Sequence, residues 1–209
     1  MKYPIGIQSF EKIRKGGFVY VDKTDLVYKL AQGSVYFLAR PRRFGKSLLV
    51  STLKAYFEGR KDLFEGLKMM ELEQEWSQYP VISFDFNGID KNTPNSLRDY
   101  LNQVIQETEA KYHLPCFETD DTTLRFRMLI PRLHEATGLH VVVLIDEYDK
   151  PLLDLLDTGN PDDEQRLINN RELLKAFFSI FKATDDHLRF VLLTGITKFS
   201  QVSMFSGFR

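Results

Sequence analysis

The chain has 209 residues, of which 43% are hydrophobic and 27% are charged, a composition typical of one globular domain with a sizeable core. Its net charge of −1 and isoelectric point near 6.4 indicate no general affinity for nucleic acid, anionic membranes or acidic substrates. The single cysteine, Cys116, excludes an intrachain disulfide and a cysteine-based metal site, and it fits a reducing compartment.

The first 33 residues contain a turn at Gly16-Gly17, an expected short strand over residues 18–21 and an expected helix over residues 23–31. In many nucleotide-binding sheets, the segment before the phosphate-binding loop folds back over the base. Apolar side chains of this segment therefore have two open interpretations, as a slot for adenine or as a cover for a sheet edge. These side chains are Ile7, Phe10, Tyr20 and Val21.

Residues 36–49 indicate a buried strand, a basic loop and a helix start in immediate succession. Gly45, Lys46 and Ser47 stand where the loop meets the helix, which is expected to continue as far as Gly59. A glycine lets backbone N–H groups surround phosphate oxygens, a lysine reaches the outer phosphates, and a serine hydroxyl in the first helical turn can ligate Mg²⁺. The order of these residues therefore predicts a phosphate-binding loop.

The loop departs from the pattern G-x-x-x-x-G-K-[ST] because Arg40 occupies the position of the first glycine. Pro41 restricts Arg40 to extended conformations, which predicts that the chain bends later in the loop. Gly-Lys-Ser alone is a weak signal, and the alternative is a solvated basic loop ahead of an ordinary helix. The predicted nucleotide-binding residues are Arg42, Arg43, Phe44, Gly45, Lys46, Ser47 and Leu48.

A second buried strand is predicted over residues 81–86, and it ends at the turn signal Asn87-Gly88. This placement puts Asp85 near the carboxyl edge of the sheet. A helix is expected over residues 122–135.

The strongest feature of the sequence is a run of five aliphatic residues, 141–145, followed by Asp146 and Glu147. Such a run predicts a central parallel strand that is buried on both faces and presents carboxylates at its carboxyl end. Paired acids can mark a solvated strand end, but after a strand, a Gly-Lys-Ser loop and a helix they are typical of nucleoside triphosphatases. Asp146 is predicted to hold Mg²⁺ through water, and Glu147 is predicted to polarise the attacking water.

Residues 154–164 are expected to form an exposed loop, followed by a helix from about Arg171 and a strand over residues 188–194. Thr194, the last polar residue of that strand, falls where a related ATPase places a sensor of the γ-phosphate. It is therefore assigned a catalytic role with Lys46 and Glu147, while the alternative is a β-branched residue that simply ends a strand.

The sequence favours ATP over GTP. Guanine-specific P-loop proteins use an Asn/Thr-Lys-x-Asp element, and residues 197–200 lack its aspartate. The acidic strand is also not followed by Asp-x-x-Gly, because Asp149 stands in the place of the glycine. A small-molecule kinase with Glu147 or Asp149 as the base is less favoured, because no basic lid is evident.

Several stretches together resemble the AAA-ATPase-like proteins of bacteria, and they cover nearly the whole chain. They are IGIQSF (5–10), YVDKT (20–24), RPRRFGKS (40–47), LIDEYDKP (144–151) and LTGITKFS (193–200). The resemblance implies an ATP-binding module with a three-layer α/β fold and a mostly parallel sheet, of the additional-strand type. In that type the sensor strand, here 188–194, lies between the phosphate-loop strand and the acidic strand. An arginine in place of the first glycine is usual in this family.

The resemblance also implies a domain organisation and partners. One domain over residues 1–209 is expected, with a base-covering segment (1–33) and a P-loop core (34–209). Family members commonly continue into a nuclease-like domain of the PD-(D/E)xK class, for which this sequence has no motif. The family's next strand and helical lid would lie beyond Arg209, so a truncation after the sensor strand is expected. Nucleic acid is then expected as a partner only indirectly, through a nuclease-like domain or a partner protein beyond this chain.

Two functions stay open, an ATPase that acts as a motor or switch and a nucleotide-dependent regulatory module with little turnover. In the first, Lys46 binds the phosphates of ATP, Ser47 and Asp146 hold Mg²⁺, and Glu147 orients water. An oligomer with an arginine finger from a neighbour also stays open. A membrane partner is not expected, because the longest aliphatic run is far too short to cross a bilayer, and the cytoplasm is the expected compartment.

Overall fold

The computed structural model describes residues 1–90, 93–156 and 158–196. Its sheet contains strands β1 (Val35–Ala39), β2 (Val81–Asp85), β3 (Val141–Asp146) and β4 (Leu188–Gly195). The α-helices of the described residues are α1 (Phe10–Lys15), α2 (Thr24–Ala31), α3 (Lys46–Phe57), α4 (Met69–Leu72), α5 (Ser96–Lys111), α6 (Thr122–Thr137), α7 (Lys150–Leu153) and α8 (Pro161–Ala183). Short 3₁₀ turns are η1 (Lys61–Leu63), η2 (Phe86–Gly88) and η3 (Asp185–His187).

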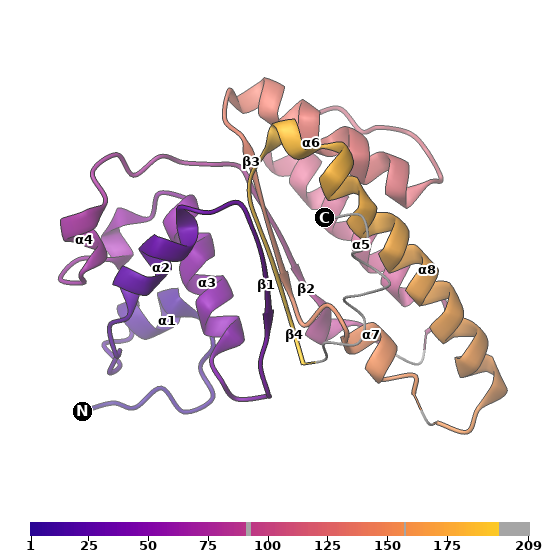
Figure 1. Ribbon diagram of the computed structural model, residues 1–209, viewed down its shortest axis with the longest axis horizontal. Coiled ribbons are helices and arrows are strands. Elements are labelled where there is room, and N and C mark those ends of the chain that lie inside the picture. Colours follow the sequence, from indigo (N-terminus) through magenta and orange to yellow (C-terminus); the bar gives the residue numbers. More distant parts are fainter. Residues whose placement is uncertain (91–92, 157, 197–209) are drawn as a thin grey trace.

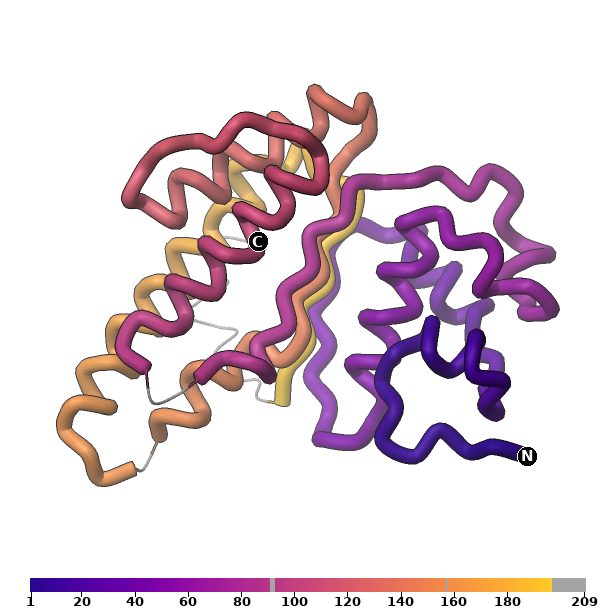
Figure 2. The backbone as a smooth tube through the Cα atoms, turned by 180° about the vertical axis from the view of Figure 1, so that it is seen from behind, coloured from indigo at the N-terminus to yellow at the C-terminus, as the bar shows by residue number. Residues whose placement is uncertain are grey.

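The strands are arranged in the order β1-β4-β3-β2, and every pair is parallel. The predicted position of the sensor strand, between the phosphate-loop strand and the acidic strand, is therefore confirmed. Helices α1–α4 cover one face of the sheet and α5–α8 cover the other, so the predicted three-layer α/β fold is also confirmed (Figure 1, and from behind in Figure 2). Pairing of Ala39 with Gly195 and of Asp85 with Asp146 aligns the carboxyl ends of the strands at one edge.

The core follows from the alternation of side chains along these strands. In β3, Val141, Val143 and Ile145 face the cluster under α5–α8, whereas Val142 and Leu144 face the cluster under α1–α4. All five are fully buried, which is the burial predicted for a central parallel strand. The sheet is thus a rigid layer whose carboxyl edge positions the loops of the candidate site.

Two expected elements differ from the structure. Helix α8 begins at Pro161, ten residues earlier than expected, because Asn160 Oδ1 accepts the amide of Asp162 and acidic side chains occupy the first turn. Residues 161–164 are therefore helical and not loop. Residues 18–21 do not form a strand, because their only described pairing is a single bridge between Lys2 and Phe18.

Within the described ranges, no helix combines the length and the apolar character needed to cross a membrane.

Candidate functional site

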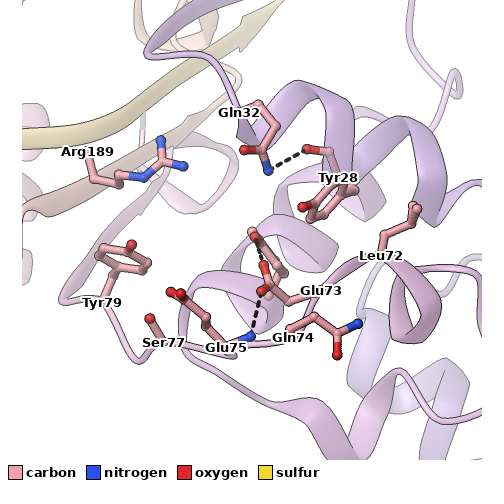
Figure 3. Close-up of a pocket in the computed structure, with 10 residues that line it drawn as sticks. Tyr28, Gln32, Leu72, Glu73, Gln74, Glu75, Ser77, Tyr79 and Arg189 are labelled. Carbon is pink, nitrogen blue, oxygen red and sulfur yellow. Dashed lines mark hydrogen bonds between the residues drawn. The ribbon is translucent and has the colours of Figure 1, made fainter.

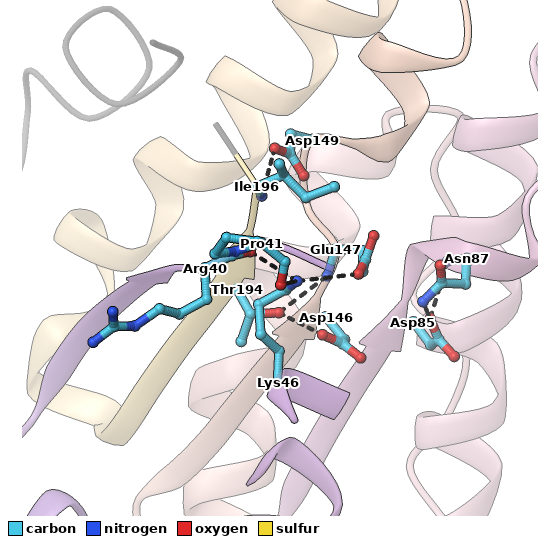
Figure 4. Close-up of polar contacts among 10 residues, drawn as sticks. All are labelled: Arg40, Pro41, Lys46, Asp85, Asn87, Asp146, Glu147, Asp149, Thr194 and Ile196. Carbon is cyan, nitrogen blue, oxygen red and sulfur yellow. Dashed lines mark hydrogen bonds and ion pairs between the residues drawn. The ribbon is translucent and has the colours of Figure 1, made fainter. Parts of the chain in front are cut away.

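The carboxyl edge of the sheet brings together three segments that are far apart in the sequence. They are the loop from β1 to α3, the end of β3 and the end of β4, and Figure 4 shows their polar side chains converging. Because β4 lies between β1 and β3, residues at its end can contact both the loop and the acidic strand.

The loop turns where the sequence predicts, after Arg40. The Arg40 amide donates to Gly195 O over 3.1 Å, which continues the pairing of β1 with β4. Positive φ angles occur at Arg43 (68°) and at Gly45 (75°), immediately before α3. Arg42, Arg43 and Phe44 are exposed, with Phe44 68% accessible, so the loop presents basic and aromatic side chains to solvent.

Lys46 is buried at the first position of α3, with 4% of its surface exposed. Its Nζ donates to Arg40 O over 3.0 Å and to Pro41 O over 3.3 Å. The same atom lies 3.5 Å from Glu147 Oε1, an ion pair whose side chains are 3% and 13% exposed. The predicted lysine of the phosphate loop and the predicted base of the acidic strand are therefore in direct contact.

A second set of contacts joins the ends of β3 and β4. The Thr194 hydroxyl donates to Asp146 Oδ1 and accepts from the Glu147 amide over 3.2 Å. The Tyr148 amide then donates to Thr194 O over 2.9 Å. Thr194 is fully buried, so its hydroxyl orients Asp146 and the backbone of Glu147 and is not exposed to solvent.

Glu147 adopts a left-handed backbone conformation, with φ of 54°, which is uncommon for a residue other than glycine. This conformation bends the chain at the end of β3 and accompanies the approach of the Glu147 carboxylate to Lys46. Tyr148 follows, fully buried, and its ring passes so close to Gly195 that a Cβ there would lie 2.3 Å from Tyr148 Cε1. Only a glycine fits at the end of β4.

Asp149 is a residue of this edge that the sequence singled out only as an alternative kinase base. It is 1% exposed, and its Oδ2 accepts the amide of Ile196 over 2.9 Å. The Asp149 carboxylate therefore anchors the chain that leaves β4. Residues 197–200, which were compared with a guanine-recognition element, lie outside the described residues.

The remaining predicted residues lie around this centre. Ser47 and Leu48 are half-buried in the first turn of α3, and Asp85 is exposed at the end of β2. The four apolar side chains proposed for an adenine slot do not form one open surface. Phe10 is fully buried, with its ring centroid 4.9 Å from that of Phe64, whereas Val21 is 71% exposed.

The structure combines a parallel sheet, a Gly-Lys-Ser loop ahead of a helix, and a strand that ends in two carboxylates. This arrangement is that of a P-loop nucleotide-binding protein. The chain belongs to the AAA-ATPase-like family, described as predicted AAA-ATPases, which it matches over residues 4–205. The family supports nucleotide binding as the general function of the chain.

The chain is also 42% identical, over 209 residues, to a curated protein from Azotobacter chroococcum mcd 1 named "Uncharacterized protein in vnfD 5'region". The alignment covers 99% of this chain and 39% of that relative, so the chain spans about two fifths of the relative's length. No solved structure matches the chain.

Proposed function

We propose that the chain binds ATP with Mg²⁺ at the β1–α3 loop and hydrolyses it slowly, as a motor or switch for an attached or partner domain. The observation that carries this proposal is the direct contact of Lys46 with Glu147, beside the Thr194–Asp146 hydrogen bond. These four residues come from the phosphate loop, the acidic strand and the sensor strand, and they are the residues that the chemistry requires.

Phosphate binding rests on Lys46 and on the start of α3. The loop amides and the first N–H groups of the helix have no intrahelical partners, and the helix dipole favours negative charge at this end. Lys46 is held under the loop by the carbonyls of Arg40 and Pro41, within reach of any phosphate that enters. The exposed Arg42 and Arg43 add positive charge at the entrance.

The donor set fits Mg²⁺, which binds few protein oxygens directly and keeps several waters. Ser47 supplies a hydroxyl in the first turn of α3, and Asp146 supplies a carboxylate at the end of β3. Thr194 engages Oδ1 of Asp146, which leaves Oδ2 for the water shell of a cation. When bound, Mg²⁺ would neutralise charge on the β- and γ-phosphates.

Glu147 is the proposed general base. In the structure its carboxylate is paired with Lys46, and a phosphate that enters the loop would compete with that carboxylate for the ammonium group. Once Lys46 turns to the phosphate, the Glu147 carboxylate can accept a proton from the attacking water. Thr194 keeps the Glu147 backbone in place through its hydroxyl during this change.

The same ion pair favours a second candidate function, a regulatory module that binds ATP with little turnover. While the Glu147 carboxylate is paired with Lys46, it is not placed to accept a proton from water, so turnover requires the pair to separate. Of the two candidate bases for a kinase, Asp149 is disfavoured because it is buried and accepts the Ile196 amide, which leaves Glu147 as the candidate.

The proposed target is an attached nuclease-like domain or a partner protein. In the Azotobacter relative, the part that aligns with this chain is 39% of the protein, so that protein has a further region where such a domain could lie. The proposal also keeps residues 1–33 as the segment over the base. Its α1 is fixed to the phosphate-loop helix, because the Phe10 amide donates to Ser51 Oγ over 2.9 Å.

The test is titration of the purified chain with labelled ATP and Mg²⁺. Lys46→Ala should abolish measurable binding, because the charge of Lys46 against the phosphate oxygens is then lost. Lys54→Ala is the matched control, since Lys54 is exposed on the same helix, and it should bind ATP like the wild type. If Lys46→Ala bound ATP with wild-type affinity, the nucleotide site would not be at this loop.

A further inference from the structure

A cavity of about 310 Å³ lies on the α1–α4 side of the sheet, away from the phosphate loop. Figure 3 shows side chains from α2, α3, the α4–β2 segment and the start of β4 surrounding one space. The lining includes the aromatic and charged side chains Tyr28, Tyr56, Glu73, Glu75, Tyr79 and Arg189.

This cavity is separate from the nucleotide site. Arg189 is the second residue of β4, whereas Thr194 lies near the other end of the same strand. Five residues of extended chain span roughly 17 Å, so the two sites lie at opposite edges of the sheet. Tyr79 precedes β2 and Gln32 precedes β1, which also places the cavity at the amino ends of the strands.

Arg189 is engaged by the protein itself. Its Nη1 donates to Gly33 O over 3.1 Å and its Nη2 donates to Ala31 O over 2.8 Å. Its guanidinium carbon lies 5.8 Å from the ring centroids of both Phe57 and Tyr79. One wall of the cavity thus already holds a guanidinium group against aromatic faces.

Glu73 is held as a carboxylate inside the cavity. Its Oε2 accepts from the Tyr56 hydroxyl over 2.5 Å, and its Oε1 accepts from the Glu75 amide over 2.9 Å. Burial raises the pKa of Glu73, but hydrogen bonds from Tyr56 and the backbone outweigh it and leave that pKa below its usual value. Glu73 is therefore ionised at neutral pH.

Neither Glu73 nor Glu75 forms an ion pair with any lysine or arginine among the described residues. The lining therefore carries two carboxylates against one guanidinium, and that guanidinium is committed to carbonyls and rings. Tyr28, Tyr56 and Tyr79 add aromatic rings beside the carboxylates.

We propose that this cavity binds an organic cation, a guanidinium or ammonium group on a short aliphatic stem. The carboxylates of Glu73 and Glu75 would receive the cationic head, and the tyrosine rings would contact the stem and the edge of the head. The volume suits such a group, because it lies at the lower end of the range for ligand pockets, roughly 300–1,000 Å³. A free anion is disfavoured by the excess of negative charge.

The test is an NMR titration of the ¹⁵N-labelled chain with propylguanidinium and with propylurea, its neutral analogue of the same shape. Propylguanidinium should shift amide signals of residues 72–79, and propylurea should not. Because Glu75 is exposed at the mouth of the cavity, Glu75→Gln should weaken propylguanidinium binding about threefold, the contribution of an exposed ion pair. Glu71→Gln is the matched control, because Glu71 is an exposed carboxylate just outside the cavity, and it should bind like the wild type.

Two further arms sharpen the result. The cation could be an arginine side chain of a partner protein or a free small molecule, and N-acetyl-arginine amide distinguishes the two. If it binds more tightly than propylguanidinium, the cation is an arginine side chain of a partner. If it binds more weakly, the cation is a free small molecule. Lys46→Ala should leave cation binding unchanged, because the two sites are separate. The proposal would be overturned if propylguanidinium and propylurea bound equally well, or if no cation bound. It would also be overturned if the signal changes were confined to the phosphate loop.

Discussion

Replacement of Glu147 by Gln should have opposite effects on the binding and on the hydrolysis of ATP. Glu147 Oε1 lies 3.5 Å from Lys46 Nζ in the structure, and both side chains are largely buried. ATP must compete with this carboxylate for the lysine, and the γ-phosphate is also repelled by it. Glutamine keeps the size of the side chain and removes the charge, so ATP should bind Glu147→Gln more tightly than the wild type.

The magnitude follows from the separation of the charges. Two unit charges 3.5 Å apart attract by about 5 kcal/mol at an effective dielectric constant of about 20. Desolvation of the pair offsets most of this, which leaves a net contribution of about 1–2 kcal/mol. ATP affinity should therefore rise about 5- to 30-fold in Glu147→Gln. Hydrolysis should fall by roughly 10²- to 10⁴-fold, because the general base is lost.

Affinity is measured by titration with labelled ATP and Mg²⁺, and chemistry by single turnover with the protein in excess of ATP, which excludes product release from the rate. Glu172→Gln serves as the control, because Glu172 is exposed on α8, and it should match the wild type in both assays. If Glu147→Gln bound ATP more weakly than the wild type, the idea that ATP competes with the Glu147 carboxylate for Lys46 would be refuted. An unchanged hydrolysis rate would show that Glu147 is not the base, and a wild type without turnover would favour the regulatory module.

Two other predictions concern stability. Thr194→Val removes the buried hydroxyl between Asp146 and the Glu147 amide, so chemical denaturation should show a loss of about 1–3 kcal/mol, most of which Thr194→Ser should restore. Burial and the neighbouring His140 and His187 hold the pKa of His134 below its usual value, so the folded state binds fewer protons than the unfolded state. The free energy of unfolding should therefore fall as the pH drops through the histidine range, and His134→Gln should flatten this dependence in thermal melts.

Residue patterns predicted the residues at the carboxyl edge of the sheet, and the resemblance to the AAA-ATPase-like family supplied the order of the strands. The aliphatic run 141–145 predicted a central strand, and the Gly-Lys-Ser loop indicated which end of the sheet holds the candidate site. Lys46, Asp146 and Glu147 follow from these two features, Thr194 follows from the strand over residues 188–194, and the structure brings the four together. Their roles in binding and catalysis stay predictions.

The contacts that connect these residues could not be predicted, because they depend on the register between β3 and β4. The Lys46–Glu147 pair occurs together with a left-handed conformation at Glu147, which no local pattern in the sequence predicts. The anchoring of Ile196 by Asp149 joins residues 47 positions apart. The early start of α8 is different, since Asn160, Pro161 and the acids that follow are a recognisable helix start. The cluster of glycine, proline and acidic residues there favours a loop when composition alone is considered.

The structure explains how the loop accommodates Arg40 at the position of the first glycine of the common pattern. A glycine at this position would allow a turn directly after β1, but here the Arg40 amide still pairs with β4 through Gly195 O. The turn is instead made at Arg43 and Gly45, at the cost of about 1 kcal/mol for a left-handed arginine. Lys46 Nζ then holds the extended segment in place by donating hydrogen bonds to the carbonyls of Arg40 and Pro41. In Figure 4 the Arg40 side chain points away from these contacts, so an arginine fits where the common pattern needs a glycine.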